Sequence, residues 1–215
     1  MTTNDEEMRD PEKFWARLAK TDNWRDYILP KRNDQEFWEE GLRQVKAIEK
    51  YVFPQDIVID YGCGIGRMAK YMATRCHRVI GIDICKSFIE IAQEMTNVPN
   101  VEFYKFNRKC NHYIGAGMAD FIYCISVIQH NTPENRELIM DDIYTFLKPG
   151  GRCFINFPRL GPIYRGSQFV TVFTEESVRQ LAHKFSEVII EPGNLVGYGG
   201  RKIEGDNELF LIATK

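Results

Sequence analysis

The sequence predicts an α/β protein built on a parallel sheet with helices on both faces. Short apolar segments rich in β-branched residues alternate along the chain with segments whose apolar residues recur at helical spacing. Two of the apolar segments, 57–61 and 78–83, carry a carboxylate at or next to their ends, and three glycines follow the first of them. No repeat or linker divides the 215 residues, a length that suits a single domain with a substantial core.

The composition is that of a soluble globular protein, with 44% hydrophobic and 27% charged residues. A net charge of −2 offers no general attraction to nucleic acid or to an anionic membrane. Charged residues interrupt every apolar run well short of a membrane-spanning length, and the first ten residues are polar and acidic, unlike a secretory signal. We therefore expect a cytoplasmic protein with neither a nucleic acid nor a membrane partner. Nothing in the composition indicates the oligomeric state.

The cysteines predict neither disulfides nor a metal site. There are six, with no Cys-x-x-Cys pair: Cys63, Cys76, Cys85, Cys110, Cys124 and Cys153. Several lie in apolar strand segments, where cysteine acts as a small hydrophobic residue, so we expect them to be reduced. Cys110 and His112 alone are too few to hold a metal ion, and no metal is predicted.

The first 53 residues predict a helical cap that belongs to the same domain as residues 54–215. Asp10-Pro11 is a helix start, with a capping carboxylate before a proline in the first turn. Asn33 and Glu36 have the spacing of a capping box for a second helix, which ends before Pro54.

The remaining chain alternates between strands and helices. Strands are predicted over residues 57–61, 78–83, 101–106, 120–127, 152–157, 188–190 and 208–213. Helices are predicted to begin near Ile65, before Phe88, at Thr132-Pro133 and at Thr174, and the segment 147–151 to form a helix stop and a turn. The segment 120–127 is almost continuously apolar, which favours a central strand buried on both faces. The short connection between the last two strands favours antiparallel pairing.

The glycine turn after the first strand predicts a ligand site. Gly62, Gly64 and Gly66 allow positive φ and close approach of a ligand, and the following helix would present free N–H groups to an anion. Asp60 can accept from an ammonium group or fix the turn, and Asp83 can accept from a ribose diol. A dinucleotide fingerprint would need a third glycine at Arg67, so the dehydrogenase spacing fails. A turn without a ligand role stays open as the alternative.

These residues resemble the motifs of the class I S-adenosylmethionine-dependent methyltransferases. Asp60-Tyr61-Gly62-Cys63-Gly64-Ile65-Gly66 is similar to the first motif, and Gly81-Ile82-Asp83-Ile84 to the second. Further similarity lies in the segments 101–107, 120–130, 147–151 and 173–177, so that the resemblance runs from about Tyr51 to Lys215. It implies a single Rossmann-like seven-stranded sheet of order 3-2-1-4-5-7-6, with strand 7 antiparallel and S-adenosyl-L-methionine as the cofactor.

The resemblance also implies a role for each matching position. Asp60, Gly62 and Gly64, with Tyr61 and Cys63 in the same turn, would hold the methionine part of the cofactor. Asp83 would bind the ribose hydroxyls and Ile84 would lie against the adenine. Asn107, where many members carry Asp, would meet the adenine amino group, with Arg108 beside it. Ile125 and Ser126 would lie beneath the sulfonium.

His130 is the candidate general base, because it follows the fourth strand at the cofactor end and its ordinary pKa suits proton transfer near neutral pH. Packing or hydrogen bonding that shapes the pocket is the alternative role. His77, His112 and His183 have no motif support. Aromatic residues of irregular segments that could cover the site are Trp24, Tyr27, Tyr164 and Tyr198, and the N-terminal helices add Phe14, Trp15, Phe37 and Trp38 as a cap on the pocket or the domain edge. Cations that could attract an anionic acceptor are Arg159, Arg165, Arg201 and Lys202.

The sequence thus predicts an enzyme that moves a methyl group from S-adenosylmethionine to oxygen or nitrogen of a small-molecule acceptor. An anionic group on that acceptor would suit the cations of the late loops. Two other functions stay open: a non-catalytic cofactor-binding subunit of a partner enzyme, and a nicotinamide-dependent oxidoreductase.

Overall fold

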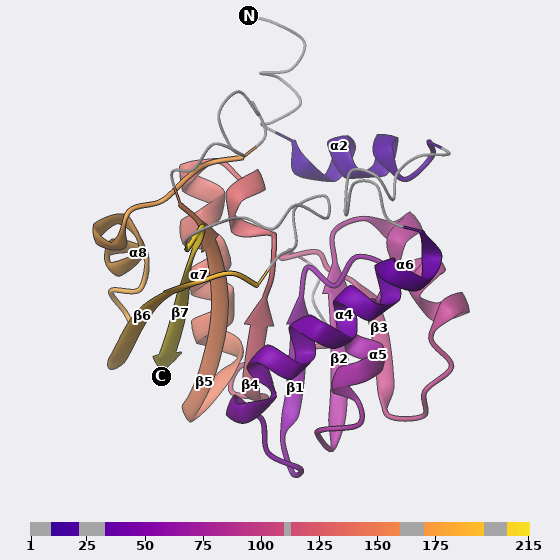
Figure 1. The fold of residues 1–215 in the computed structure, drawn as a ribbon, viewed down its shortest axis with the longest axis horizontal. Coiled ribbons are helices and arrows are strands. Elements are labelled where there is room, and N and C mark those ends of the chain that lie inside the picture. The colour runs from indigo at the N-terminus through magenta and orange to yellow at the C-terminus, as the bar shows by residue number, and fades with distance from the viewer. Residues whose placement is uncertain (1–9, 22–32, 110–112, 160–169, 196–205) are drawn as a thin grey trace, which may run out of the picture.

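Seven strands form one sheet in the order β3-β2-β1-β4-β5-β7-β6, as the sequence predicts (Figure 1). The computed structural model describes residues 10–21, 33–109, 113–159, 170–195 and 206–215. The strands are β1 (Ile57–Tyr61), β2 (Arg78–Asp83), β3 (Val101–Lys105), β4 (Ala119–Cys124), β5 (Leu147–Pro158), β6 (Glu187–Gly193) and β7 (Glu208–Thr214). The first five are parallel, and β7 is antiparallel to both β5 and β6. The predicted fold class is confirmed.

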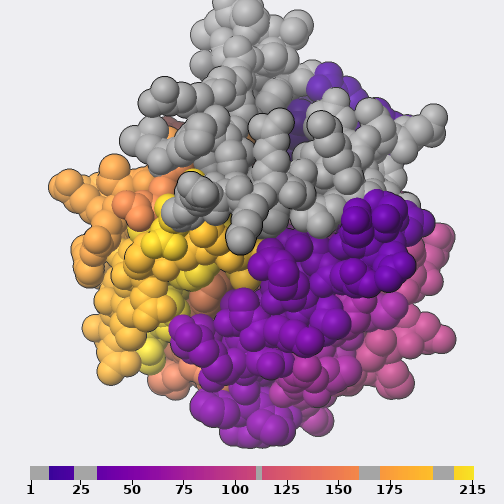
Figure 2. Space-filling view, in the orientation of Figure 1, coloured from indigo at the N-terminus to yellow at the C-terminus, as the bar shows by residue number. Residues whose placement is uncertain are grey.

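Helices cover both faces of the sheet. On one face lie α4 (Asp34–Ile48), α5 (Ala69–Met72) and α6 (Lys86–Met95), and on the other lie α7 (Pro133–Phe146) and α8 (Glu175–Leu181). Alternate residues of β1 supply the two cores: Val58 packs with the first group and Ile59 with the second. Such two-sided burial explains why the central strands are apolar throughout. In the space-filling view α4 lies across the sheet beside the late strands (Figure 2).

The two N-terminal helices begin at the predicted caps. Helix α2 (Pro11–Leu18) starts after Asp10, whose carboxylate accepts from the Lys13 amide at 3.1 Å. Asn33 and Glu36 form a complete capping box at the start of α4, which continues into the 3₁₀ turn η1 (Glu49–Tyr51). Helix α2 lies above the carboxyl ends of the parallel strands (Figure 1).

The helix after the glycine turn begins later than predicted. It starts at Ala69 rather than near Ile65, because Gly66 has a φ of 78°, which a right-handed helix cannot include. The predicted fourth strand is also too long: β4 ends at Cys124 rather than Val127. Ser126 has a φ of 61°, outside the extended region, and the chain then enters the 3₁₀ turn η2 (Ile128–His130).

The segment 147–151 does end a helix, as predicted, but it is part of β5 rather than a separate turn. Leu147 pairs with Ala119 of β4, and the Gly150 amide donates to the Lys215 carbonyl at 3.0 Å. Strand β6 extends on both sides of the predicted segment 188–190, because it pairs with β7 along its whole length.

Candidate functional site

A cavity of about 470 Å³ lies at the carboxyl ends of β1, β2 and β4. The residues predicted to hold the cofactor and the candidate base all line it: Asp60, Tyr61, Gly62, Cys63, Gly64, Asp83, Ile84, Asn107, Arg108, Ile125, Ser126 and His130. Parallel strands bring these residues together, because their carboxyl ends meet at the same edge of the sheet.

The glycine turn packs against β2 and leaves one position open to the cavity. The amides of Gly62 and Cys63 both donate to the Ile82 carbonyl, at 2.8 and 2.9 Å. A Cβ at Gly62 would lie 2.3 Å from Cγ2 of Val127, whereas a Cβ at Gly64 would meet no atom within 4 Å. Gly64 therefore leaves the free space that a ligand can fill.

The amides of the glycine turn itself are engaged within the protein, and the helix begins further along the chain than the sequence predicts. The amides at Gly62, Cys63, Gly64 and Gly66 all donate within the protein, and the following helix has only four residues, beginning at Ala69. The turn packs on β2, and the amides of Gly62, Cys63 and Gly64 therefore donate to Ile82 and Asp83 of that strand. These amides are not free to donate to a ligand.

Two carboxyl groups, the buried Asp60 and the half-buried Asp83, stand at the ends of β1 and β2. Burial raises the pKa of Asp60 to about 7; the Tyr123 hydroxyl opposes the shift, Asp83 adds to it and Arg67 opposes it. Burial likewise raises the pKa of Asp83 to about 6, against the donation it accepts from the Cys85 and Gly64 amides at 2.8 and 2.9 Å. A cationic ligand group would favour the ionised form of either carboxyl.

Hydrogen bonds to Asp142 hold Arg108 in place at the wall of the cavity. Its Nε donates to both carboxylate oxygens of Asp142, at 3.0 and 2.9 Å, and the Tyr61 hydroxyl donates to the same carboxylate at 2.7 Å. Neighbouring Asn107 accepts from the Lys109 amide through Oδ1 at 3.0 Å. An amide oxygen has two lone pairs, so one acceptor position on Asn107 stays available for a ligand.

His130 and helix α2 are in contact at the wall of the cavity. The His130 ring meets Trp15 edge to face, with 5.5 Å between the ring centroids. Asp10, Pro11 and Glu12 of the same helical segment also line the cavity. Helix α2 thus forms one wall beside the candidate base.

Other predicted residues do not join the site or fall outside the described residues. Arg159 is exposed and does not line the cavity, and the exposed His183 contacts its own helix through Nδ1, 2.9 Å from the Gln180 carbonyl. Outside the described residues lie Trp24, Tyr27, Cys110, His112, Tyr164, Arg165, Tyr198, Arg201 and Lys202. Within the described part of the chain, no cluster of three or more His, Cys, Asp or Glu residues could hold a metal ion.

Sequence reasoning did not identify two buried polar residues near the site, Asn156 and Glu208. Asn156 donates to Glu208 and accepts from the Ser126 amide. The signal was present: an amide inside the apolar strand segment 152–157, and a carboxylate at the first residue of the last apolar strand.

Comparison with known proteins shows which proteins this chain resembles. Residues 58–151 match the family model described as a methyltransferase domain. A ubiquinone biosynthesis O-methyltransferase of Acinetobacter baylyi is 31% identical over 102 residues, which are 46% of this chain and 42% of that protein. A phosphoethanolamine N-methyltransferase of Plasmodium falciparum is 28% identical over 99 residues, 46% of this chain and 37% of that protein. The chain spans about half the length of the curated relatives that it matches.

Solved structures are similar over most of the chain. The crystal structure of an S-adenosylmethionine-dependent methyltransferase from Archaeoglobus fulgidus superposes with a TM-score of 0.65 at 17% identity, covering 85% of this chain and 97% of the other. Similarity at this level of identity shows a shared fold. Separately, no helix in the described ranges has both the length and the apolar character needed to cross a membrane.

Proposed function

We propose that this chain is a class I S-adenosylmethionine-dependent methyltransferase, because it shares the fold of a solved enzyme of that kind and its residues 58–151 match the model of a methyltransferase domain. From this premise we propose that it transfers a methyl group from S-adenosylmethionine to an oxygen or nitrogen atom of a small-molecule acceptor. The supporting observation is the cavity at the strand ends, which gathers every residue that the motifs assign to the cofactor.

The cavity suits a nucleoside cofactor with an amino acid tail. Its volume of about 470 Å³ lies within the range of roughly 300–1,000 Å³ usual for small-molecule sites. The space beside Gly64, where a Cβ would meet no atom within 4 Å, leaves room for the ligand next to the backbone. Asp60 and Asp83 supply acceptors for an ammonium group and for ribose hydroxyls.

When bound, S-adenosylmethionine supplies a methyl group already activated by a positive sulfonium. The chain then has to hold the acceptor in line with that methyl group and exclude water. Ile84 and Asn107 would orient the adenine, the first by packing and the second by accepting from its amino group. Trp15 would shield the reacting end of the cavity, since it lines the cavity and packs against the His130 ring.

His130 would serve as general base through an imidazole nitrogen that takes a proton from the acceptor. It lies four residues after Ser126 in the segment that follows β4, and both residues line the cavity. For this role His130 must come within hydrogen-bond distance of the acceptor atom in the complex. His130→Ala should then lower kcat while the affinity for the cofactor stays near that of the unmodified protein.

The relatives favour a small-molecule acceptor. Their names include an O-methyltransferase of ubiquinone biosynthesis and an N-methyltransferase of phosphoethanolamine, which supports oxygen or nitrogen as the atom methylated. We also propose that the protein works in the cytoplasm, since the five described cysteines are free. Residues 1–53 would act as a cap on the domain formed by residues 54–215, because α2 lines the cavity.

Calorimetry with S-adenosylmethionine, S-adenosylhomocysteine and NAD tests the cofactor first. Binding of the first two and not of NAD supports the proposal, and binding of NAD alone would favour an oxidoreductase. A screen of hydroxyl and amine acceptors with methyl-labelled cofactor tests transfer next. Tight cofactor binding without transfer to any acceptor, also in the presence of cell extract, would instead favour a non-catalytic subunit.

A further inference from the structure

Ser126 has an unusual backbone conformation at the wall of the cavity. Its φ of 61° is left-handed, and among the described residues no other residue except glycine has a positive φ. A side chain at such a position costs conformational free energy, so the conformation persists only where neighbouring groups hold it. Ser126 lines the cavity at the end of β4.

A series of buried hydrogen bonds fixes the backbone of Ser126. Its amide donates to Oδ1 of Asn156 at 2.7 Å, and Nδ2 of Asn156 donates to Oε1 of Glu208 at 2.5 Å. The second carboxylate oxygen of Glu208 accepts from the Leu195 amide. Asn156 and Glu208 both have 0% of their surface exposed.

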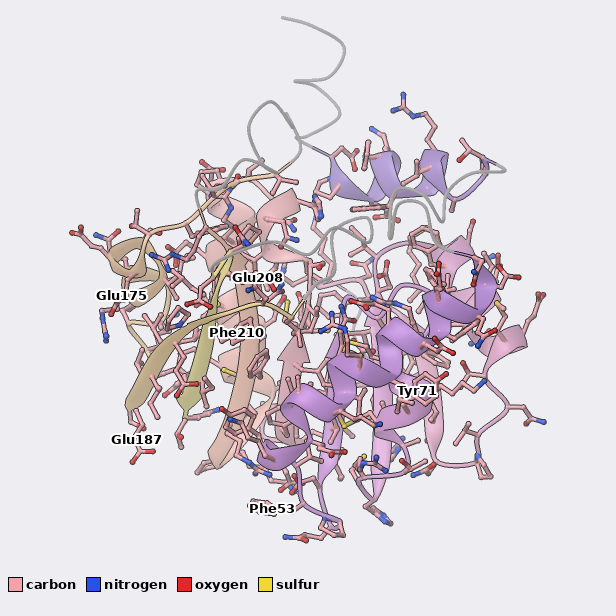
Figure 3. All side chains as sticks on the ribbon, in the orientation of Figure 1. Phe53, Tyr71, Glu175, Glu187, Glu208 and Phe210 are labelled. Atoms are coloured by element: carbon pink, nitrogen blue, oxygen red, sulfur yellow. The ribbon has the colours of Figure 1, made fainter. Side chains whose placement is uncertain are left out.

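The positions of Asn156 and Glu208 in the fold relate these hydrogen bonds to the cavity. Asn156 belongs to β5 and Glu208 is the first residue of β7, at the end of the sheet where β4 leads into the cavity (Figure 3). Neither residue lines the cavity itself. Their effect on a bound ligand is therefore indirect, and Ser126 is the cavity residue that their hydrogen bonds reach.

Joining β5 to β7 does not require these side chains. The two strands already pair through their backbones at every position from Arg152 with Thr214 to Pro158 with Glu208. Burying a carboxylate and an amide between them costs more desolvation than an apolar pair would. An apolar pair could accept neither from the Ser126 amide nor from the Leu195 amide, and of these two residues only Ser126 lines the cavity.

We propose that Asn156 and Glu208 are positioning residues that hold Ser126 in its left-handed conformation at the cofactor end of the cavity. The proposal rests on the proposed function, since that function puts S-adenosylmethionine in the cavity. Glu208 orients the Asn156 amide by accepting from its Nδ2, so that Oδ1 faces the Ser126 N–H. The conformation of Ser126 then sets the shape of the wall against which the cofactor lies.

Glycine at position 126 provides the test, because glycine adopts a positive φ without a side-chain penalty. The variants are Asn156→Ala, Ser126→Gly and the two combined, with affinity for S-adenosylhomocysteine measured by calorimetry. Asn156→Ala should weaken binding about tenfold or more, and Ser126→Gly alone by no more than about threefold. In the Ser126→Gly background, Asn156→Ala should cost no more than about threefold further.

Equal losses in both backgrounds, or no loss in Asn156→Ala, would overturn the proposal, because a purely structural role for Asn156 does not depend on the residue at 126. If Asn156→Ala fails to fold, Asn156→Leu combined with Glu208→Met replaces both polar groups with apolar ones and enters the same comparison.

Thermal unfolding of the four proteins, without ligand, gives a second readout. Ser126→Gly should raise the unfolding midpoint less in the Asn156→Ala background than in the unmodified one, because a serine released by Asn156 can already leave the strained conformation, and equal effects would count against the proposal. This comparison needs no cofactor. Absence of any cofactor binding by the unmodified chain would therefore refute the proposed function, whereas absence of coupling between positions 126 and 156 would refute this inference.

Discussion

Gly64→Ala should damage cofactor binding more than it damages the fold. Gly64 lines the cavity with a φ of 53°, and a Cβ there meets no heavy atom within 4 Å. The free energy of unfolding should therefore fall only by the conformational cost of a left-handed alanine, about 1–2 kcal/mol. For a chain of this length that cost lowers the unfolding midpoint by about 2–8 °C. The new methyl group, however, occupies space that the cofactor needs.

Gly150→Ala is the matched control. Gly150 has a φ of 75° and equally open space around a Cβ, but it belongs to the first residues of β5 and does not line the cavity. Both variants should therefore lose similar stability. Affinity for S-adenosylhomocysteine should fall about tenfold or more in Gly64→Ala, which corresponds to about 1.4 kcal/mol, and by less than about twofold in Gly150→Ala.

Gly62→Ala should show the opposite balance. Its Cβ would lie 2.3 Å from Cγ2 of Val127, so overpacking of about 1–3 kcal/mol adds to the backbone cost. The total loss of about 2–5 kcal/mol makes it the least stable of the three variants. Differential scanning fluorimetry and calorimetry measure both quantities. Wild-type affinity in Gly64→Ala, or equal affinity losses in Gly64→Ala and Gly150→Ala, would refute this account of the glycine turn.

Four further predictions concern buried polar groups. The raised pKa of Asp60, about 7, means that its carboxyl ionises near neutrality, so cofactor affinity should rise between about pH 6 and pH 8, and calorimetry of Asp60→Asn should show a flatter profile. In the ligand-free protein the free energy of unfolding should fall over about pH 4–7 from the same group, because the native state retains a proton that the unfolded state releases. Asp142→Asn, which weakens the support of Arg108 and Tyr61, should cost about 1–3 kcal/mol in denaturant unfolding, and an unchanged midpoint would contradict it. Gln44 is fully buried with neither amide atom hydrogen-bonded within the described structure, so Gln44→Met should stabilise by about 1 kcal/mol, and a loss of stability would show that the amide has a role.

The sequence alone determined the elements that rest on local pattern. The bounds of β1 and β2 agree with the predicted ones. A β-branched apolar run with an acid at its end is a local pattern, so recognising it requires no knowledge of residues far away in the chain. The helix caps at Asp10 and Asn33 are local for the same reason. The cofactor residues follow glycines and strand-end acids, and the parallel order of strands brings them to one edge.

Other features depend on residues far apart in the chain, and only the tertiary structure decided them. Ser126 ends β4 early because Asn156, 30 positions later, accepts from its amide, and Glu208 is a further 52 positions along. Likewise Trp15 meets His130 only because α2 crosses the strand ends. Local propensity does not encode such contacts, because each depends on the three-dimensional path of the chain between its partners.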